Sequence, residues 1–302
     1  MLRSLYAGVS GLKSNQVKMD VIGNNVANSS TTAFKSGRVG FTDLFSQTLS
    51  NAQGATTTAV GGVNAKQVGL GVSVGTIDTI MTIGSTQTTG RDLDFAIDGE
   101  GFFIVSPDST GASRLYTRDG VFYTDSAGNL VNGSGLRVLG TRPDDTAINL
   151  DTDGDTETVG AALLASAVPV PNSSNLVPLN IPSTIDGYEM ESFTIDGTGL
   201  ISAVYNGTTV YLGRVALAKF NNPEGLEKTG GNTYTATGNS GTVQIGIAGT
   251  GSYGAIKQGF LEMSNVDLAT ELTDMIISSR AYQANSKTIT TSDEMLQYLL
   301  NM

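Results

Sequence analysis

The residues best suited to chemistry form an acidic run at residues 151–157, where four carboxylates stand within seven positions. Loops of this kind hold Ca²⁺ when a further acidic residue completes the coordination sphere. The twelfth position counted from Asp151 is Ala162, where an EF-hand requires a bidentate glutamate. The spacing therefore fits a solvated acidic turn better than a calcium site, and we expect no bound metal.

Other signatures of catalysis are weak. The chain contains no Cys and no His, which excludes thiolate or imidazole ligands, Cys nucleophiles and triads with an imidazole base. The glycine-rich residues 69–75 lack the spacing and the following helix of a dinucleotide site. A carboxylate pair for glycoside hydrolysis stays open, because 28 acidic residues always allow one, but nothing selects it. We predict no cofactor and no enzymatic activity.

The overall composition describes a folded, acidic protein. Of the 302 residues, 39% are hydrophobic, enough to build the core of one large or two moderate domains. The formal net charge of −11 argues against nucleic acid as a partner. The longest mostly apolar run, residues 161–170, is far shorter than the ~20 residues of a membrane helix, so we expect no membrane insertion. Lys13 and Lys18 interrupt the N-terminus, which therefore lacks the apolar stretch of a cleaved signal peptide.

Residues 260–302 contain no Gly and no Pro, although the chain has 38 Gly elsewhere. This predicts a long C-terminal helix that begins near Val266, with Ser264 and Asn265 as its N-cap and Asp267 just inside the first turn. The apolar positions of this helix follow the three- and four-residue steps of a coiled coil: Leu268, Leu272, Met275, Tyr282, Ile289, Leu296 and Leu300.

The N-terminal residues show the same steps, interrupted at Gln16 and Gly23. The apolar positions are Leu2, Leu5, Val9, Leu12, Met19 and Val26. Residues 1–40 carry five basic side chains against one acidic, whereas residues 257–302 carry three basic against six acidic. Opposite charges favour pairing of the two segments, within one chain or between neighbouring copies. An ordinary two-helix unit that closes a domain is the alternative.

The middle of the chain changes to the period of two that β-strands show. Leu93, Phe95 and Ile97 alternate with polar or small residues, and residues 99–101 then predict a hairpin turn into residues 102–105. Further short strands separated by glycine-containing turns predict an antiparallel β body.

We therefore predict an α+β protein whose N- and C-terminal helices pair as a coiled coil, with a central antiparallel β domain. The predicted helical coiled-coil domain comprises residues 1–45 and 257–302. The predicted extended linkers are residues 46–90 and 248–256, and the β-rich outer domain is residues 91–247, with a small insertion around residues 141–190.

Several short motifs resemble those of the bacterial flagellar rod, hook and hook-associated axial proteins. The matching residues are Asn24, Asn25, Asn28, Thr32, Phe34, Lys35, Asn265 and Asp267. Residues 92–103, 116–130 and 280–296 agree as well. Two departures concern the local turn: Ser29 and Ser30 replace a usual apolar-Asn pair, and Ala33 stands where many relatives have Gly.

The resemblance implies a structural subunit that polymerises helically, with the terminal coiled coil lining an inner tube and the β domains outside. Within the family the hook type is favoured by residues 61–71, residues 261–268 and the extra middle segment. It implies a hollow, bendable universal joint that transmits motor torque to the filament for motility. Phe260 and residues 297–299 keep the distal rod type as the alternative.

The implied partners are further copies of the chain, the distal rod protein, the hook cap and hook-filament junction proteins, and the flagellar type III export apparatus. The implied location is the extracellular hook and basal body, reached without a cleaved signal peptide. A secreted enzyme or carbohydrate-binding β domain with helical dimerisation arms is the competing class, and it leaves both terminal motifs unexplained.

Overall fold

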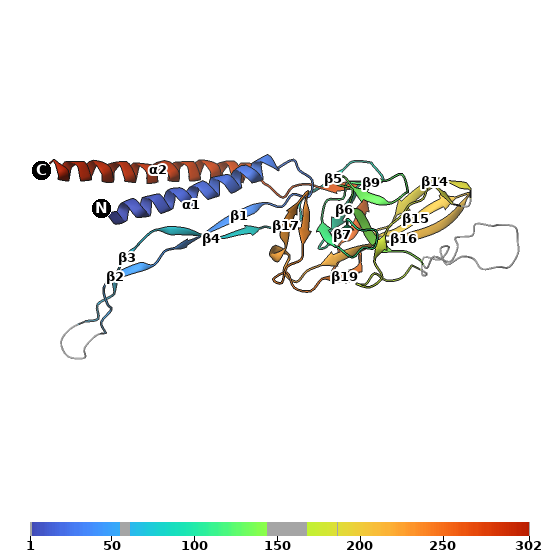
Figure 1. The fold of residues 1–302 in the computed structure, drawn as a ribbon, viewed down its shortest axis with the longest axis horizontal. Coiled ribbons are helices and arrows are strands. Elements are labelled where there is room, and N and C mark those ends of the chain that lie inside the picture. The colour runs from blue at the N-terminus through green and yellow to red at the C-terminus, as the bar shows by residue number, and fades with distance from the viewer. Residues whose placement is uncertain (1, 55–60, 144–167, 186, 302) are drawn as a thin grey trace. The chain divides into compact units, whose positions relative to one another are not determined.

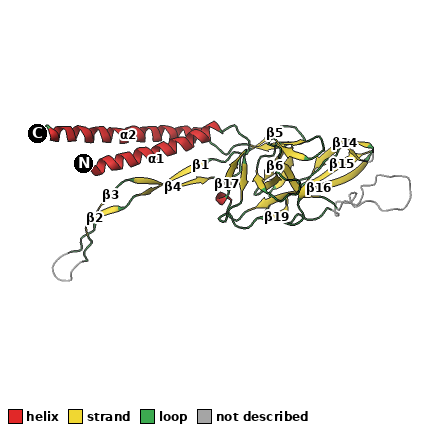
Figure 2. Ribbon diagram, viewed as in Figure 1, coloured by secondary structure: helices red, strands yellow, loops and turns green. Residues whose placement is uncertain are grey.

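The computed structural model describes residues 2–54, 61–143, 168–185 and 187–301 of the chain. These residues are mostly β-structure, with one long helix near each end (Figures 1 and 2). The fold class is therefore α+β, as predicted. The chain divides into two compact units. The helix unit contains Met1–Ser29, Lys35–Ile80 and Val266–Met302, and the β unit contains Ser30–Phe34 and Met81–Asn265.

The helix unit consists of two helices and an antiparallel arm. Helix α1 (Leu2–Ala27) and helix α2 (Leu268–Leu300) lie side by side, coloured blue and red in Figure 1. In the arm, β1 (Gly37–Asp43) pairs with β4 (Val72–Thr79), and β2 (Ser46–Ser50) pairs with β3 (Lys66–Gly69). Both pairings are antiparallel and two-stranded.

The arm corrects two sequence predictions. Helix α1 ends at Ala27, so the helical segment does not extend to residue 45, and β1 occupies part of the remainder. Residues 46–90, predicted as an extended linker, contain β2, β3, β4 and β5 (Thr86–Thr88). These strands have few large apolar residues and no alternating buried face, which is the signal on which a strand prediction depends.

Thirteen strands of the β unit form one sheet system, whose main path runs β13-β14-β15-β16-β11-β7-β8-β18-β17. Strands β9, β10, β12 and β19 pair beside this path. The bounds are β7 (Phe102–Ser106), β8 (Leu115–Thr117), β9 (Phe122–Thr124), β10 (Leu130–Asn132), β11 (Arg137–Thr141), β12 (Val177–Pro178), β13 (Thr184–Ile185), β14 (Tyr188–Ile195), β15 (Leu200–Tyr205), β16 (Thr208–Lys219), β17 (Glu227–Gly230), β18 (Thr233–Thr235) and β19 (Gln244–Ile247). A short 3₁₀ helix, η3, occupies Pro223–Gly225.

The core of the β unit lies on both faces of β7. Side chains alternate across a strand, and Phe103 and Val105 enter one buried apolar cluster whereas Phe102 and Ile104 enter another. Strand β7 is buried along its whole length, which explains why its sequence is a continuous apolar run instead of an alternating one.

The predicted hairpin between residues 93–98 and 102–105 is wrong. Strand β6 (Phe95–Asp98) pairs with β20 (Ala255–Gln258), whereas β7 pairs with β8, β11 and β16. Gly99 and Gly101 do adopt positive φ, at 135° and 142°. They redirect the chain between two sheets instead of closing a hairpin, because the partner of β6 comes from a segment distant in sequence.

Helix α2 begins at Leu268, two residues beyond the predicted start near Val266. The predicted helical domain also includes residues 257–265, which contain the end of β20 and all of β21 (Phe260–Glu262), and β21 pairs with β5. The N-cap of α2 is Asp267, whose carboxylate accepts a hydrogen bond from the Ala269 amide at 3.0 Å. Ser264 and Asn265 therefore do not cap the helix.

The predicted insertion around residues 141–190 contributes β12, β13 and the start of β14 to the β unit. Leu179 and Ile181 from this segment join the buried core. The acidic run at residues 151–157 and Ala162 lie outside the described residues.

Candidate functional site: the helix pair and its flanking motif

Small residues bring α1 and α2 together in an antiparallel pair. Ser4 Oγ lies 3.4 Å from Ser292 Oγ near one end of the pair. A Cβ atom at Gly11 would lie 2.6 Å from Asn285 Nδ2, and one at Gly8 would lie 3.1 Å from Ile289 Cγ1. Gly8 and Gly11 therefore leave room for Ile289 and Asn285 where the two helices approach closely.

Polar side chains fix the other end of the helix pair. Asn25 is buried, and its Nδ2 donates to Glu271 Oε1 at 2.9 Å and to the Gly37 carbonyl at 2.8 Å. The Gly37 amide donates back to Asn25 Oδ1 at 2.9 Å. Lys18 Nζ forms an ion pair with Asp274 Oδ1 at 3.6 Å. Asn25 thus ties together α1, α2 and β1 in the helix unit.

Burial raises the pKa of the Glu271 carboxyl above its usual range, although the hydrogen bond from Asn25 opposes the shift. Protonated Glu271 can still accept the Asn25 hydrogen bond, so this site tolerates either charge state.

The predicted packing residues do not form a continuous seam within the chain. Half-buried positions are Leu5, Leu12, Met19, Val26, Met275, Ile289 and Leu296. Exposed positions are Val9, Leu268, Leu272, Tyr282 and Leu300. The side chain of Leu2 lies outside the described part of the structure. The residues buried most deeply at the pair are instead Gly8, Gly11, Ser14, Ile22, Asn25, Ser278 and Ser292.

Two groups of large apolar side chains on α2 are exposed to solvent, one near each end of the helix. Leu268, Leu272, Ile276, Ile277, Met295, Tyr298, Leu299 and Leu300 are each exposed. Tyr6 on α1 is 70% exposed. Sequence periodicity locates apolar residues on the helices, but it cannot distinguish an apolar face that is buried within the chain from one that stays exposed.

The family motif residues that follow α1 dock on the β unit. Thr32 Oγ1 donates to Asp119 Oδ1 at 3.1 Å, and the Thr32 carbonyl accepts from Asn232 Nδ2 at 3.0 Å. Phe34 is buried under the ammonium of Lys228, 4.9 Å from the ring centroid. Burial raises the pKa of Asp119, and the hydrogen bond from Thr32 lowers it in part.

The remaining motif residues stabilise the ends of the two helices or join neighbouring segments of the chain. Asn28 donates from its backbone and its side chain to the Asn24 carbonyl, at 3.1 and 2.9 Å, and so closes the last turn of α1. Lys35 is fully buried. Asn265 Nδ2 donates to Thr82 Oγ1 at 3.0 Å, and Asp267 caps α2. Hydrogen bonds from Thr270 and Ala269 hold the pKa of Asp267 below its usual range.

Ala33 stands where many relatives have Gly, and its backbone adopts a turn conformation that favours glycine. Its φ is 55°, in the left-handed region that favours glycine, and its amide donates to the Glu262 carbonyl at 2.8 Å. The side chain is 2% exposed. The surrounding contacts therefore hold an alanine in a conformation that costs about 1–2 kcal/mol for a non-glycine residue.

A buried ion pair that sequence reasoning missed lies behind this segment. Arg118 Nε donates to Glu262 Oε2 at 2.7 Å, with the two side chains 4% and 0% exposed. The guanidinium also donates to the carbonyls of Gly101, Gly99 and Ile97, and Glu262 Oε1 accepts from the Gly84 amide. Arg118 stands in one of the motifs quoted for the family, but no local spacing connects it to Glu262, 144 positions away.

Within the described residues, no cluster of three or more Asp, Glu, His or Cys side chains could hold a metal ion. Among the helices described there, none has the length and apolar character to cross a membrane.

Three family models match the chain: a flagella basal body rod protein at residues 5–35, the flagellar hook protein FlgE/F/G D1 domain at residues 96–203, and the flagellar basal body rod FlgEFG protein C-terminal at residues 257–302. The flagellar basal-body rod protein FlgG of Bacillus subtilis is 44% identical over 304 residues, covering all of this chain and 99% of the relative. The chain belongs to the flagellar rod and hook family.

Hook proteins of this family match as well. The flagellar hook protein FlgE of Borreliella burgdorferi is 34% identical over 444 residues and that of Treponema pallidum 33% over 465, covering the whole of both chains in each case. Among solved structures, a Helicobacter pylori flagellar hook protein FlgE2 covers 59% of this chain at 10% identity, with a TM-score of 0.40. The relatives are structural proteins of the flagellum and not enzymes, and this is the class of the present chain.

Proposed function

We propose that this chain is the structural subunit of the flagellar hook and polymerises helically into a hollow, flexible universal joint that transmits motor torque to the filament. The observation that carries self-assembly is the apolar surface of α2, where Leu272, Ile276 and Ile277 are 49, 63 and 56% exposed. Apolar patches of this kind on a folded chain mark protein contacts. Copies of the same helices in neighbouring subunits are the proposed cover for this surface.

The packing residues predicted from sequence enter this proposal in two groups. The first group is exposed in the single chain and is proposed to contact neighbouring copies. It consists of Val9, Leu268, Leu272, Tyr282 and Leu300. The half-buried residues, among them Leu12, Met275 and Ile289, complete a coiled-coil seam when further helices pack against the pair. On this view the inner tube is made of helix pairs, and the β units form the outside.

Bending follows from a difference between the two kinds of surface. Helices joined by apolar side chains resist sliding, whereas acidic β units with sparse apolar surface can shift past one another at little cost. We propose that the distal rod protein lies below the polymer and that the hook cap and hook-filament junction proteins lie above it. Export through the flagellar type III apparatus delivers the subunit to this extracellular location.

The distal rod protein is the second candidate. A rod protein FlgG is 44% identical to this chain, compared with 34% for a hook protein FlgE. The hook proposal is supported by residues 61–71 and 261–268 and by the segment that contributes β12–β14 to the β unit.

Electron microscopy of basal bodies from cells that lack this gene distinguishes the two candidates. We expect a complete rod that ends bare, without hook or filament. A rod cut short identifies the distal rod protein instead, and flagella of normal form would contradict an axial role altogether.

A further inference from the structure

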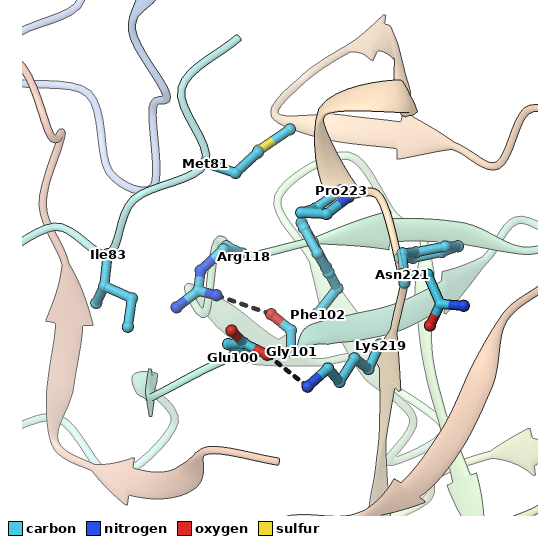
Figure 3. A pocket seen from close by; sticks show the side chains of 10 residues that line it. Met81, Ile83, Glu100, Gly101, Phe102, Arg118, Lys219, Asn221 and Pro223 are labelled. Carbon is cyan, nitrogen blue, oxygen red and sulfur yellow. Dashed lines mark hydrogen bonds and ion pairs between the residues drawn. The ribbon is translucent and has the colours of Figure 1, made fainter. Parts of the chain in front are cut away.

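The charged side chains around the open pocket of the β unit are paired within that unit. The pocket has a volume of about 430 Å³ (Figure 3). Among its lining residues, Arg118 binds Glu262 and the Gly101 carbonyl, and Lys219 binds Glu100. Strand β16, which carries Lys219, packs into both buried clusters, and such burial specifies the register of a strand. The helix unit differs, because its two helices can be aligned in more than one register.

One row of contacts between α1 and α2 recurs every seven residues on both helices and joins small or polar side chains. The pairs are Ser4 with Ser292, Gly11 with Asn285, and Asn25 with Glu271. The same spacing places Lys18 opposite Ser278. The row therefore has the heptad spacing of a coiled coil, but it lacks the large apolar side chains that usually fill one.

Most of this row does not distinguish one register from another. Ser278 Oγ is buried and forms no hydrogen bond with any group that the structure describes. Displacing α2 by one heptad, about 10 Å along its axis, gives a second set of small or polar pairs. The shifted pairs are Ser4 with Asn285, Gly11 with Ser278, and Lys18 with Glu271. The last of these pairs joins opposite charges, so the shifted register is a real competitor.

One contact favours the observed register over the shifted one. Asn25 Nδ2 donates to Glu271 Oε1 at 2.9 Å, and the amide and carbonyl of Gly37 hold the Asn25 side chain in place. Asn25 is 2% exposed. In the shifted register it would lie opposite Ser264, which precedes α2, and one of its buried N–H groups would lose its acceptor. Leaving a buried donor unpaired is costly, and a polar residue at a core position is known to fix register in this way.

We propose that the hydrogen bond between Asn25 and Glu271 selects the register of α1 against α2, and that without it the pair shifts by one heptad so that Lys18 meets Glu271. This inference concerns the single chain, so its test does not depend on the proposed function. Its consequence for assembly is direct, because copies in a helical polymer must all present the same surfaces. A shift of one heptad would move the exposed apolar groups of α2 by about 10 Å relative to α1.

The chain contains no cysteine, so engineered disulfides can report the register. The pair Ser4→Cys, Ser292→Cys can form a disulfide in the observed register, where the two Oγ atoms are 3.4 Å apart. The pair Ser4→Cys, Asn285→Cys can form one only after a shift, because the sites are about 10 Å apart along the helix and a disulfide requires Cα atoms within about 7 Å. In dilute monomer, intact mass and non-reducing gels measure the rate of intramolecular oxidation. We expect the first pair to oxidise about tenfold faster or more, the order set by one hydrogen bond.

Asn25→Asp should reverse this preference. At about pH 8 it places two ionised carboxylates together in the observed register, whereas the shifted register gives Glu271 the ammonium of Lys18. The pair Ser4→Cys, Asn285→Cys should then oxidise faster than the pair Ser4→Cys, Ser292→Cys. Adding Glu271→Gln to Asn25→Asp restores a hydrogen bond with donor and acceptor exchanged, so the observed register should return. The bond to the Gly37 carbonyl is absent from both of these variants, so this return isolates the contact with Glu271.

Ser278→Ala is the matched control, at a buried position of the same row that forms no hydrogen bond with the described residues. It should change neither oxidation rate by more than about twofold. An Asn25→Asp variant that keeps the original preference would overturn the inference, because the segments that flank the helices would then set the register. The inference is also overturned if Ser278→Ala has an equal effect, or if Asn25→Asp forms neither disulfide and the addition of Glu271→Gln does not restore the first.

Discussion

At the scale of single residues, Arg118 and Glu262 connect three segments of the β unit. Glu262 on β21 holds the Gly84 amide, and Arg118 holds the carbonyls of Gly99 and Gly101, which lead into β7. Replacing two buried charges by apolar residues is often tolerated, but removing one partner leaves the other unpaired. The ion pair therefore holds the backbone that leads into β7, and loss of either partner should destabilise the β unit.

Glu262→Gln should lower the free energy of unfolding by about 3 kcal/mol, because the Arg118 guanidinium loses its buried counterion. Denaturant unfolding of the monomer measures the change. Glu224→Gln, at an exposed position on η3, is the matched control and should shift stability by less than about 0.5 kcal/mol. Similar midpoints for both variants would show that the pair contributes no net stability.

Asp119, which accepts the Thr32 hydrogen bond, makes stability depend on pH. Burial raises its pKa above the ordinary 3.8, so the folded state binds the proton more tightly than the unfolded state. Its contribution is therefore greatest below pH 3.8 and is lost as pH rises through the raised pKa. Asp119→Asn should remove this part of the pH dependence of the melting temperature.

Asp125→Asn provides a control of opposite sign. Hydrogen bonds from Asn129 hold the pKa of Asp125 below 3.8, so its contribution is present above that pH and is lost as pH falls. If both variants changed the pH profile in the same direction, burial of Asp119 would not be the cause.

At the scale of elements, the glycines of α1 are not equivalent. Gly11 faces Asn285 across the helix pair, whereas a Cβ atom at Gly23 would meet nothing within 4 Å. Gly11→Leu should destabilise the monomer by about 1–3 kcal/mol through overpacking. Gly23→Leu should stabilise it by up to about 1 kcal/mol, because glycine is a poor helix former. Circular dichroism during thermal unfolding measures both, and stabilisation by Gly11→Leu would contradict the close approach of the helices.

The exposed face of α2 has a separate prediction. Leu272→Gln with Ile276→Gln should leave the helix content of the monomer unchanged, because both side chains are about half exposed or more. The same variant should fail to polymerise, since the apolar area that assembly covers is lost. Sedimentation of assembled material measures the effect, and Leu272→Met is the control. Intact polymers from the double variant would refute the proposed helix packing between copies.

The type of some elements could be predicted from the sequence, whereas strand pairing could not. The absence of Gly and Pro indicates α2, and alternation of apolar residues indicates β6, because both signals are local. The partner of β6 is a strand more than 150 positions away, and no local signal specifies it. Heptad spacing indicates apolar positions only, so it does not predict that Gly8, Gly11 and Ser278 are among the most buried residues of the helix pair.

At the scale of the whole molecule, the net charge of −11 opposes association of identical copies. Salt screens such repulsion, with a Debye length of about 10 Å at 0.1 M and 30 Å at 0.01 M. The critical concentration for assembly should therefore fall as NaCl rises from 0.01 to about 0.15 M. A rise over this range would mean that ion pairs across the interface outweigh the repulsion.

The family could be predicted from short motifs at both ends of the chain, but the roles of those residues could not. Asn25 and Thr32 look like ordinary polar residues in the sequence, yet each joins segments far apart along the chain. Their partners Glu271 and Asp119 are separated from them by 246 and 87 positions. Only the fold brings such groups together, because hydrogen-bond partners at this separation leave no periodic signal.

In the helix pair, the usual relation between residue type and tolerance to mutation is reversed. Glycine and serine, which normally accept substitution on a surface, occupy the tight contact between α1 and α2. Leucine and isoleucine, which normally resist substitution, lie on the open side of α2. A scan of all single substitutions would therefore give two different maps: one for abundance of the subunit, centred on Gly8, Gly11 and Ser278, and one for motility, centred on Leu272 and Ile276.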